Sequence, residues 1–315
     1  MQGFSSIINT ILTLGLAMLV GFVCVRTKYI SREVRDSLSQ LIVRLTLPIL
    51  VVTSLTKNSL THEKIIGGLA VIICAWIVIG VLFALGALAA KLFRFKAERA
   101  VMHACMTAFG NVVFVAYPLI QALYGDEGLL YAALFAFAND CWLWTVGVYK
   151  MSSVRSKNAS FGANLKKLIN PSTIAFLISL FMMLTGLKFT GVIGDVLNGI
   201  GSTTTYSSML VVGGLLADVD FGEIYKRLPL LAVTLVKMLL VPFLLILVLR
   251  FVPVADTVKS VIVFQAGMPS STVVVLLAAK YECDMRYSAE GVFVTTLLSL
   301  VTLPVLYFLM HMLLF

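Results

Sequence analysis

The chain alternates between long apolar stretches and short polar segments over its whole length of 315 residues. A helix needs about 20 apolar residues to cross the hydrocarbon core of a bilayer, and ten stretches of suitable length and hydrophobicity are present. They occupy residues 4–25, 37–56, 66–92, 99–124 and 128–149, and then 172–188, 202–217, 229–251, 258–280 and 288–312. The pattern predicts an all-α polytopic membrane protein with ten transmembrane helices, five in each half of the chain.

Two of these stretches are interrupted near their middle. The fourth contains GNVVFVAYP at residues 110–118, and the ninth contains AGMPSST at residues 266–272. The bilayer offers no water to the backbone groups that a break releases, so broken helices are tolerated where they line a cavity or bind a ligand. Matched breaks in the two halves of a chain are typical of secondary transporters that bind substrate near the membrane midplane. A simple proline kink in a packed helix is the alternative interpretation of each break.

The residues in the two breaks are suited to binding an anion. A helix that restarts inside the membrane exposes backbone N–H groups and the positive end of its dipole. The second break contains a proline, which is favoured at the first helical position, followed by three hydroxyl side chains that can cap the helix or bind a ligand. In the first break an asparagine offers donors and an acceptor before a proline that is expected to restart the helix. The predicted substrate site consists of Asn111, Pro118, Gly267, Pro269, Ser270, Ser271 and Thr272.

Three charged residues lie well away from the ends of the predicted spans. Asp140 lies at the centre of the fifth span, next to Asn139. An intramembrane carboxylate is costly and marks a functional site, commonly a proton relay. Arg44 and Lys237 each lie about two turns from a helix end; either could neutralise Asp140, or extend along its helix to the interface, which is the favoured interpretation for Lys237. The candidates for coupling transport to an ion are Asp140, Asn139 and Arg44.

Composition argues against several other classes of protein. Hydrophobic residues make up 60% of the chain and charged residues only 12%, which is outside the usage of soluble domains. The net charge of +9 comes from basic residues dispersed over short loops, whereas nucleic acid binding requires a concentrated basic face. The chain contains no HExxH, GxxxxGK[ST], CxxC or GxSxG motif, so nothing favours an enzyme, and no cofactor or metal ion is expected.

The basic residues also predict how the chain is oriented. With the N-terminus outside, the cytoplasmic loops would hold 17 of the 24 Lys and Arg residues and the outer loops 5, as the positive-inside rule requires. The longest basic loop, residues 150–168, would then be cytoplasmic and would separate a first five-helix repeat, residues 1–149, from a second, residues 169–315. Because five is odd, the second repeat is inverted, and both termini are extracytoplasmic. The expected location is the cell membrane, specifically a bacterial inner membrane.

Five groups of residues, in this order and spacing, resemble motifs of a known family. They are LIVRLTLP at 41–48, FGN at 109–111 with Pro118-Leu119, INP at 169–171, MPSS at 268–271 with AAKY at 278–281, and TTLLS at 295–299 with TLP at 302–304. Together they resemble the auxin efflux carrier family, which includes PIN-type auxin carriers and bacterial malate or malonate permeases. The resemblance covers nearly the whole chain.

The resemblance implies a sodium/proton-antiporter-like fold in which the fourth and ninth helices cross at their breaks, with a small organic anion bound beside the crossover. It also implies a scaffold of helices 1, 2, 6 and 7, a transport domain of helices 3–5 and 8–10, and a homodimer formed through the scaffold. One position departs from the family pattern. Where bacterial members usually carry a proline in the seventh helix, this chain has Tyr206, which bears on the shape of the scaffold wall that faces the substrate.

The leading hypothesis is a secondary active transporter, such as a symporter, for a small organic anion, most simply a carboxylate. Its expected partners are that anion, a coupling proton or sodium ion, membrane lipid and a second copy of the chain. A cation/proton antiporter of the same fold, with Asp140 as the carrier, would normally contain more than one acidic residue at mid-membrane depth. A non-transporting membrane sensor would normally carry a soluble signalling domain. Both remain alternatives.

Overall fold

The structure is a computed structural model that describes residues 2–154, 170–217 and 228–314. In these residues every regular element is a helix, and five helical runs are long and apolar enough to cross a membrane. These runs are Arg32–Leu55, His62–Leu92, Ala116–Ser153, Leu228–Leu249 and Met285–Leu313. The chain is therefore an all-helical polytopic membrane protein. The predicted cytoplasmic loop 150–168 lies mostly outside the described residues.

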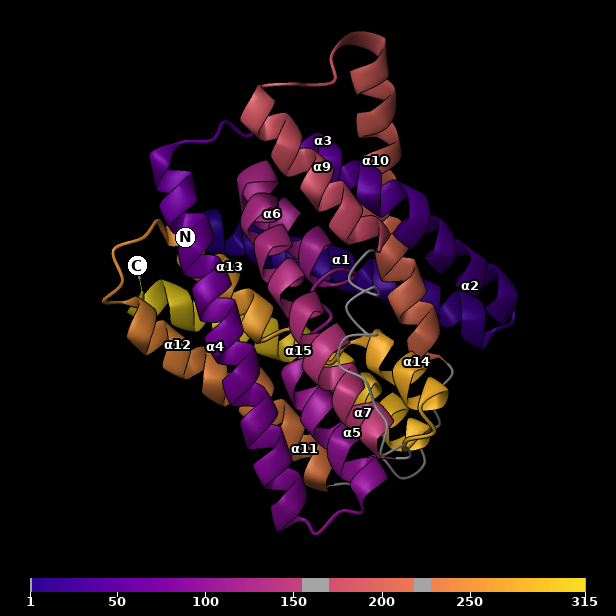
Figure 1. The fold of residues 1–315 in the computed structure, drawn as a ribbon. Coiled ribbons are helices and arrows are strands. Elements are labelled where there is room, and N and C mark those ends of the chain that lie inside the picture. The colour runs from indigo at the N-terminus through magenta and orange to yellow at the C-terminus, as the bar shows by residue number, and fades with distance from the viewer. Residues whose placement is uncertain (1, 155–169, 218–227, 315) are drawn as a thin grey trace. The chain divides into compact units, whose positions relative to one another are not determined.

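The described chain packs as two compact units, and the first comprises residues 1–68, 113–134 and 169–218. It contains α1 (Gln2–Arg26), α2 (Arg32–Leu41), α3 (Leu47–Leu55), α9 (Pro171–Thr185) and α10 (Gly191–Leu216). Figure 1 labels these helices. Helix α1 packs against α10, and α3 packs against both α9 and α10. Glycines allow α1 and α10 to touch through their backbones: a Cβ atom on Gly213 would lie 1.7 Å from the carbonyl oxygen of Met18, and one on Gly21 would lie 2.1 Å from that of Leu210.

The sequence explains where α9 begins and ends. Asn170 caps its start, since the Asn170 side-chain oxygen accepts a hydrogen bond from the N–H of Thr173 at 3.0 Å. Pro171 follows at the first helical position, where its missing N–H costs nothing. Gly186 ends the helix with a φ of 71°, a left-handed conformation that glycine adopts readily. The predicted start of this helix, at residue 172, is accordingly within one residue of the observed one.

Helix α10 begins well before the predicted position. It starts at Gly191 rather than at residue 202, and it continues without interruption past Tyr206, whose side chain is exposed. Polar residues made this first part resemble a loop, but their side chains bond to the helix itself. Asn198 donates to the carbonyl of Gly194 at 2.8 Å, and Ser202 donates to that of Gly199 at 2.8 Å. Such internal bonds let a polar segment continue a helix in an apolar setting.

The second unit comprises residues 69–112, 135–168 and 219–315. It contains most of α4 (His62–Leu92), together with α5 (Ala97–Ala108), α7 (Val148–Ser153), α11 (Leu228–Thr234), α12 (Val241–Leu249), α13 (Asp256–Ala266), α14 (Thr272–Lys280) and α15 (Met285–Leu313). The long helix α15 packs against α5, α11, α12 and α14. Helix α6 (Ala116–Trp142) contributes to both units and is kinked at Gly125, whose φ is 62°. This kink coincides with the predicted turn between the fourth and fifth spans.

Three π-helical segments interrupt the helices of the described chain. They are η1 (Ile42–Thr46), η2 (Leu143–Gly147) and η5 (Leu235–Leu240). Pro48 follows η1 and Pro242 follows η5, each near the start of the next α-helix. Because proline has no N–H for the carbonyl four residues earlier, the helix widens before it. The segments η1 and η5 contain the two intramembrane basic residues, Arg44 and Lys237, and π segments are frequent at functional sites.

The long helices expose apolar side chains along one face. On α4, Leu69, Ile73 and Ile77 lie four residues apart and are 55–60% exposed. Such a row would be unfavourable in water. In a polytopic membrane protein it faces the hydrocarbon of the lipid.

Candidate substrate site at the paired helix breaks

Both interruptions predicted from the sequence are present, and residues 109–112 of the first break bond to the second break within the second unit. The first break follows α5 and contains residues 109–115, and the second separates α13 from α14 and contains residues 267–271. The N–H of Asn111 donates to the carbonyl of Pro269 at 2.7 Å, and the N–H of Ser271 donates to that of Phe109 at 3.0 Å. Gly110 and Ser270 lie opposite each other between these bonds as an antiparallel bridge.

The two prolines were predicted to restart the helices after the breaks, and neither occupies the first helical position. Pro118 lies within the first turn of α6, which begins at Ala116, so that prediction is close. Pro269 lies inside the break and was wrongly expected at the first helical position of α14. That helix begins at Thr272, and its cap is Ser271, whose Oγ accepts from the N–H of Val273 at 3.3 Å. The carbonyl of Pro269 instead accepts the hydrogen bond from Asn111 in the first break. Pro269 lies two residues before Ser271, the cap of α14.

The last three carbonyl groups of α5 accept hydrogen bonds from side chains elsewhere in the second unit. The last carbonyls of a helix have no donor within the helix. The Oγ of Ser270 donates to the carbonyl of Met106 at 2.8 Å. The Nζ of Lys237 donates to the carbonyls of Thr107 and Ala108, at 3.0 Å and 3.1 Å. The broken end of α5 is therefore satisfied without water.

Lys237 does not extend to the membrane interface, so that prediction is wrong. Its side chain is 1% exposed, because the orphan carbonyls of α5 provide acceptors inside the unit. Within the described part of the chain Lys237 forms no ion pair. The alternative in which Lys237 neutralises Asp140 is accordingly not realised in this structure.

The N–H groups at the start of α14, predicted to be open to an anion, are partly used by the protein. The N–H of Ser270 donates to the Oγ1 of Thr295 at 3.0 Å, and that of Ser271 is bonded to the first break. Ser270 is fully buried, and both its N–H and its hydroxyl have protein partners. It therefore holds the breaks together. Thr272 is half-buried.

Small residues let the elements around the breaks come close. The ring of Phe109 lies 6.3 Å from that of Phe83, centroid to centroid, and a Cβ atom on Gly147 would come within 2.8 Å of the Phe109 ring. A Cβ atom on Gly267 would lie 2.5 Å from the Cδ1 of Leu306. Close packing against Leu306 therefore explains why position 267 is a glycine, independently of any role in substrate binding.

The three ion-coupling candidates lie in different environments. Asp140 is half-buried on α6, and Asn139 beside it is 3% exposed. The Oδ1 of Asn139 has no hydrogen-bond partner among the described residues. Arg44 is exposed on η1. No group of three or more His, Cys, Asp or Glu side chains in the described ranges could hold a metal ion.

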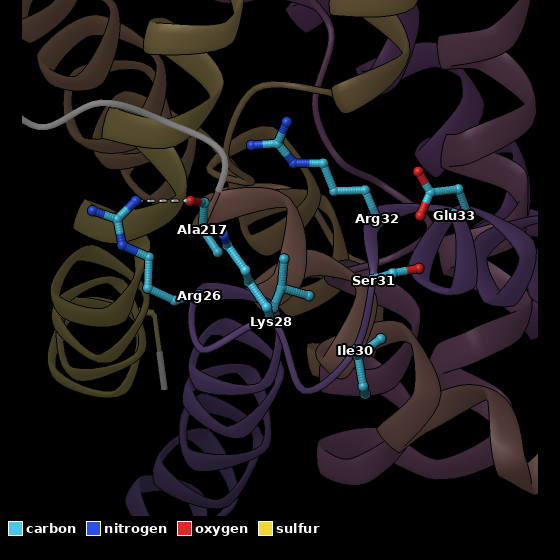
Figure 2. Close-up of a pocket in the computed structure, with 8 residues that line it drawn as sticks. Arg26, Lys28, Ile30, Ser31, Arg32, Glu33 and Ala217 are labelled. Atoms are coloured by element: carbon cyan, nitrogen blue, oxygen red, sulfur yellow. Dashed lines mark hydrogen bonds between the residues drawn. The ribbon is translucent and has the colours of Figure 1, made fainter.

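A separate basic hollow of about 600 Å³ lies in the first unit and was not anticipated from the sequence (Figure 2). It is lined by Val25, Arg26, Lys28, Ile30, Ser31, Arg32, Glu33 and Ala217. Arg26 donates to the carbonyl of Ala217, the C-cap of α10, at 3.4 Å, and Ser31 caps the start of α2. These contacts support helix ends, which accounts for Arg26 and Ser31 without a ligand.

Comparison with known proteins finds a protein family and two relatives that match nearly the whole chain. The family described as "Membrane transport protein" matches residues 6–307. An uncharacterized transporter of Methanocaldococcus jannaschii is 21% identical over 304 residues, which cover 94% of this chain and 96% of that protein. An uncharacterized transporter of Methanothermobacter thermautotrophicus is 24% identical over 302 residues, with the same shares covered. Neither name specifies a substrate.

Proposed function

Because this chain belongs to the membrane transport protein family, which makes it a transporter rather than an enzyme, we propose that it is a secondary active transporter of a small organic anion. The anion, a carboxylate, binds where the two helix breaks meet and crosses the cell membrane by alternating access. The observation that carries this proposal is the mutual pairing of the breaks, through the N–H groups of Asn111 and Ser271. Paired breaks of this kind are where transporters place their substrate.

The proposed architecture is a pair of inverted five-helix repeats that together make ten transmembrane helices. The scaffold consists of α1, α2 with α3, α9 and α10, and the transport domain consists of helices 3–5 and 8–10. The division of the described chain into two packing units supports this assignment, with residues 113–134 as the exception. Helix α9 exposes Leu177, Phe181 and Leu184, an apolar face that suits either lipid or the scaffold of a second copy in a homodimer.

Transport by purified protein in proteoliposomes tests the proposal. Uptake of labelled malate, malonate and indole-3-acetate is measured with a pH gradient, with a sodium gradient and with neither. We expect saturable uptake of at least one carboxylate, increased by one of the gradients. Liposomes without protein are the control. If no carboxylate enters under any gradient while a cation gradient is dissipated, the cation/proton antiporter alternative replaces the proposal.

The variant Asp140→Asn tests whether the coupling ion is a proton carried by Asp140. The amide keeps the size and hydrogen bonding of the carboxyl group but cannot titrate. We expect the variant to lose pH-driven accumulation and to retain exchange of anion for anion, since exchange moves no net proton. Asp195→Asn, on an exposed part of α10, is the matched control. Full pH-driven accumulation by a normally folded Asp140→Asn protein would remove Asp140 from the coupling mechanism.

A further inference from the structure

Lys237 is buried, and no acidic side chain among the described residues pairs with it. The residue is 1% exposed and makes two hydrogen bonds, both to backbone carbonyls. Burying an ion is costly unless it is paired and hydrogen-bonded. The carbonyl end of α5 supplies only a partial negative charge, about half an elementary charge. When its amine is protonated, Lys237 therefore leaves a net positive charge beside the first break.

The sign of this charge matters because α5 would otherwise repel an anion. A helix that ends at mid-membrane presents its negative end there, and the Nζ of Lys237 covers that end at the carbonyls of Thr107 and Ala108. The next carbonyl along the chain, that of Phe109, accepts from Ser271 at the start of α14. Three consecutive carbonyl groups thus accept hydrogen bonds from two groups of positive character, the Lys237 ammonium and the N-terminus of α14. The paired breaks favour a negative ligand over a positive one.

We propose that Lys237 supplies the fixed positive charge of the substrate site and that a carboxylate of the bound anion is its counter-ion. The inference rests on the proposed function and deepens it by assigning the residue that selects anions. An ammonium group has three N–H donors, and the third has no partner among the described residues. The carboxylate accepts this bond or acts across one water molecule.

The competing explanation is that Lys237 is only a hydrogen-bonding clamp for α5. Ligand charge separates the two explanations. Malonate, its singly charged monoamide and its neutral diamide have nearly the same shape, so a fixed positive charge in the site ranks them by charge. A clamp does not. Affinity is measured with purified protein in detergent, by calorimetry and by the ligand-dependent rise in melting temperature, and malate and indole-3-acetate are included as further probes.

Three variants of Lys237 separate the effect of its charge from the effect of its hydrogen bonds. Lys237→Arg keeps the charge, Lys237→Gln keeps a donor without charge, and Lys237→Met keeps neither. We expect Lys237→Gln to bind malonate at least about tenfold more weakly, with a smaller loss for the monoamide, because charge interactions are strong in a low dielectric. Lys237→Arg should stay within about threefold of the native protein. Lys259→Gln, which removes a lysine at the start of α13 whose Nζ lies 3.6 Å from Asp256, is the matched control and should bind as the native protein does.

The outcomes distinguish failure of the inference from failure of the proposed function. Native-like affinity of a folded Lys237→Gln protein, or equal losses for malonate and its monoamide, overturns the inference and leaves the proposed function standing. If the native protein binds none of the carboxylates, the proposed function fails and the inference fails with it. If Lys237→Gln does not fold, the charge series on the native protein decides: binding of the diamide as tight as that of malonate overturns the inference.

Discussion

The contact between α1 and α10 and the pairing of the two breaks bring helices together in opposite ways. Between α1 and α10, Gly21 and Gly213 have no side chains, and the two backbones therefore touch. At the breaks, the helical hydrogen bonds are missing, and the backbone N–H and C=O groups there need other hydrogen-bond partners. Ser270, Thr295 and Lys237 provide those partners. The first contact is apolar and leaves nothing to bind a polar solute, whereas the second concentrates donors and positive charge inside the protein.

Gly213→Ala should have the largest effect and would break the first contact. Its new methyl group would meet the backbone of Met18, which no rotamer change can relieve, so the cost is expected at the upper end of about 1–3 kcal/mol or beyond. We expect a large fall in melting temperature in detergent and poor assembly. Gly199→Ala, in the same helix with nothing within 4 Å of its Cβ position, should be neutral or stabilising. Equal melting temperatures for the two variants would contradict the close backbone contact.

Ser270→Ala should damage the pairing of the breaks by a smaller amount. It removes the donor to the carbonyl of Met106 and leaves that carbonyl buried without a partner, at a cost of about 1–3 kcal/mol. Ser299→Ala is the matched control, because among the described residues the Oγ of Ser299 bonds only to a carbonyl of its own helix, that of Thr296. We expect a lower melting temperature for Ser270→Ala than for Ser299→Ala. The reverse order would show that Ser270 does not hold the breaks together.

Asn111→Ala and Ser271→Ala sharpen the comparison by testing ligand binding. Each should weaken carboxylate binding about ten- to a hundredfold if its side chain bonds the anion, since such a bond is worth roughly 1.5–3 kcal/mol. Ser271→Ala also removes the cap of α14, so its melting temperature is measured without ligand to separate stability from affinity. Ser299→Ala again serves as control. Unchanged affinity in both variants would move the binding site away from the breaks.

Arg44→Gln should have the smallest effect on stability. Arg44 is exposed on η1, and exposed charges contribute little, so we expect a change within about 0.5 kcal/mol. The melting temperature in detergent measures this. A fall as large as that of Ser270→Ala would show that Arg44 has a buried partner in the membrane-embedded protein.

The sequence predicted much of this fold because most of its signals are local. The ends of α9 follow from Asn170, Pro171 and Gly186, and the existence of both breaks follows from polar and small residues within apolar stretches. The resemblance to the auxin efflux carrier family is likewise confirmed by the match over residues 6–307. The early start of α10 was missed because hydrophobicity alone cannot show that polar side chains bond to their own helix.

The candidate site was predicted less completely, because its polar groups are matched across long distances in the sequence. Lys237 lies 130 residues from Thr107 along the chain, so its partner could not be read from the local sequence. Its distance from the end of its own helix wrongly predicted that it extends to the membrane interface. Ser270 was expected to face a ligand and instead bonds to α5 and α15. Thr295 was part of a family motif but had no assigned role. In each case the partner is created only when the two breaks meet.

The most direct test of the paired breaks as an anion site is substrate protection of a cysteine at position 272. The variant Thr272→Cys is made in a protein whose five native cysteines, all free thiols, are replaced, and its reaction rate with a polar thiol reagent is measured in detergent. The account predicts that the carboxylate accumulated by proteoliposomes slows this reaction and leaves the rate at a control variant, Asp126→Cys, unchanged. An unchanged rate at position 272 in a protein that still transports the carboxylate would contradict it.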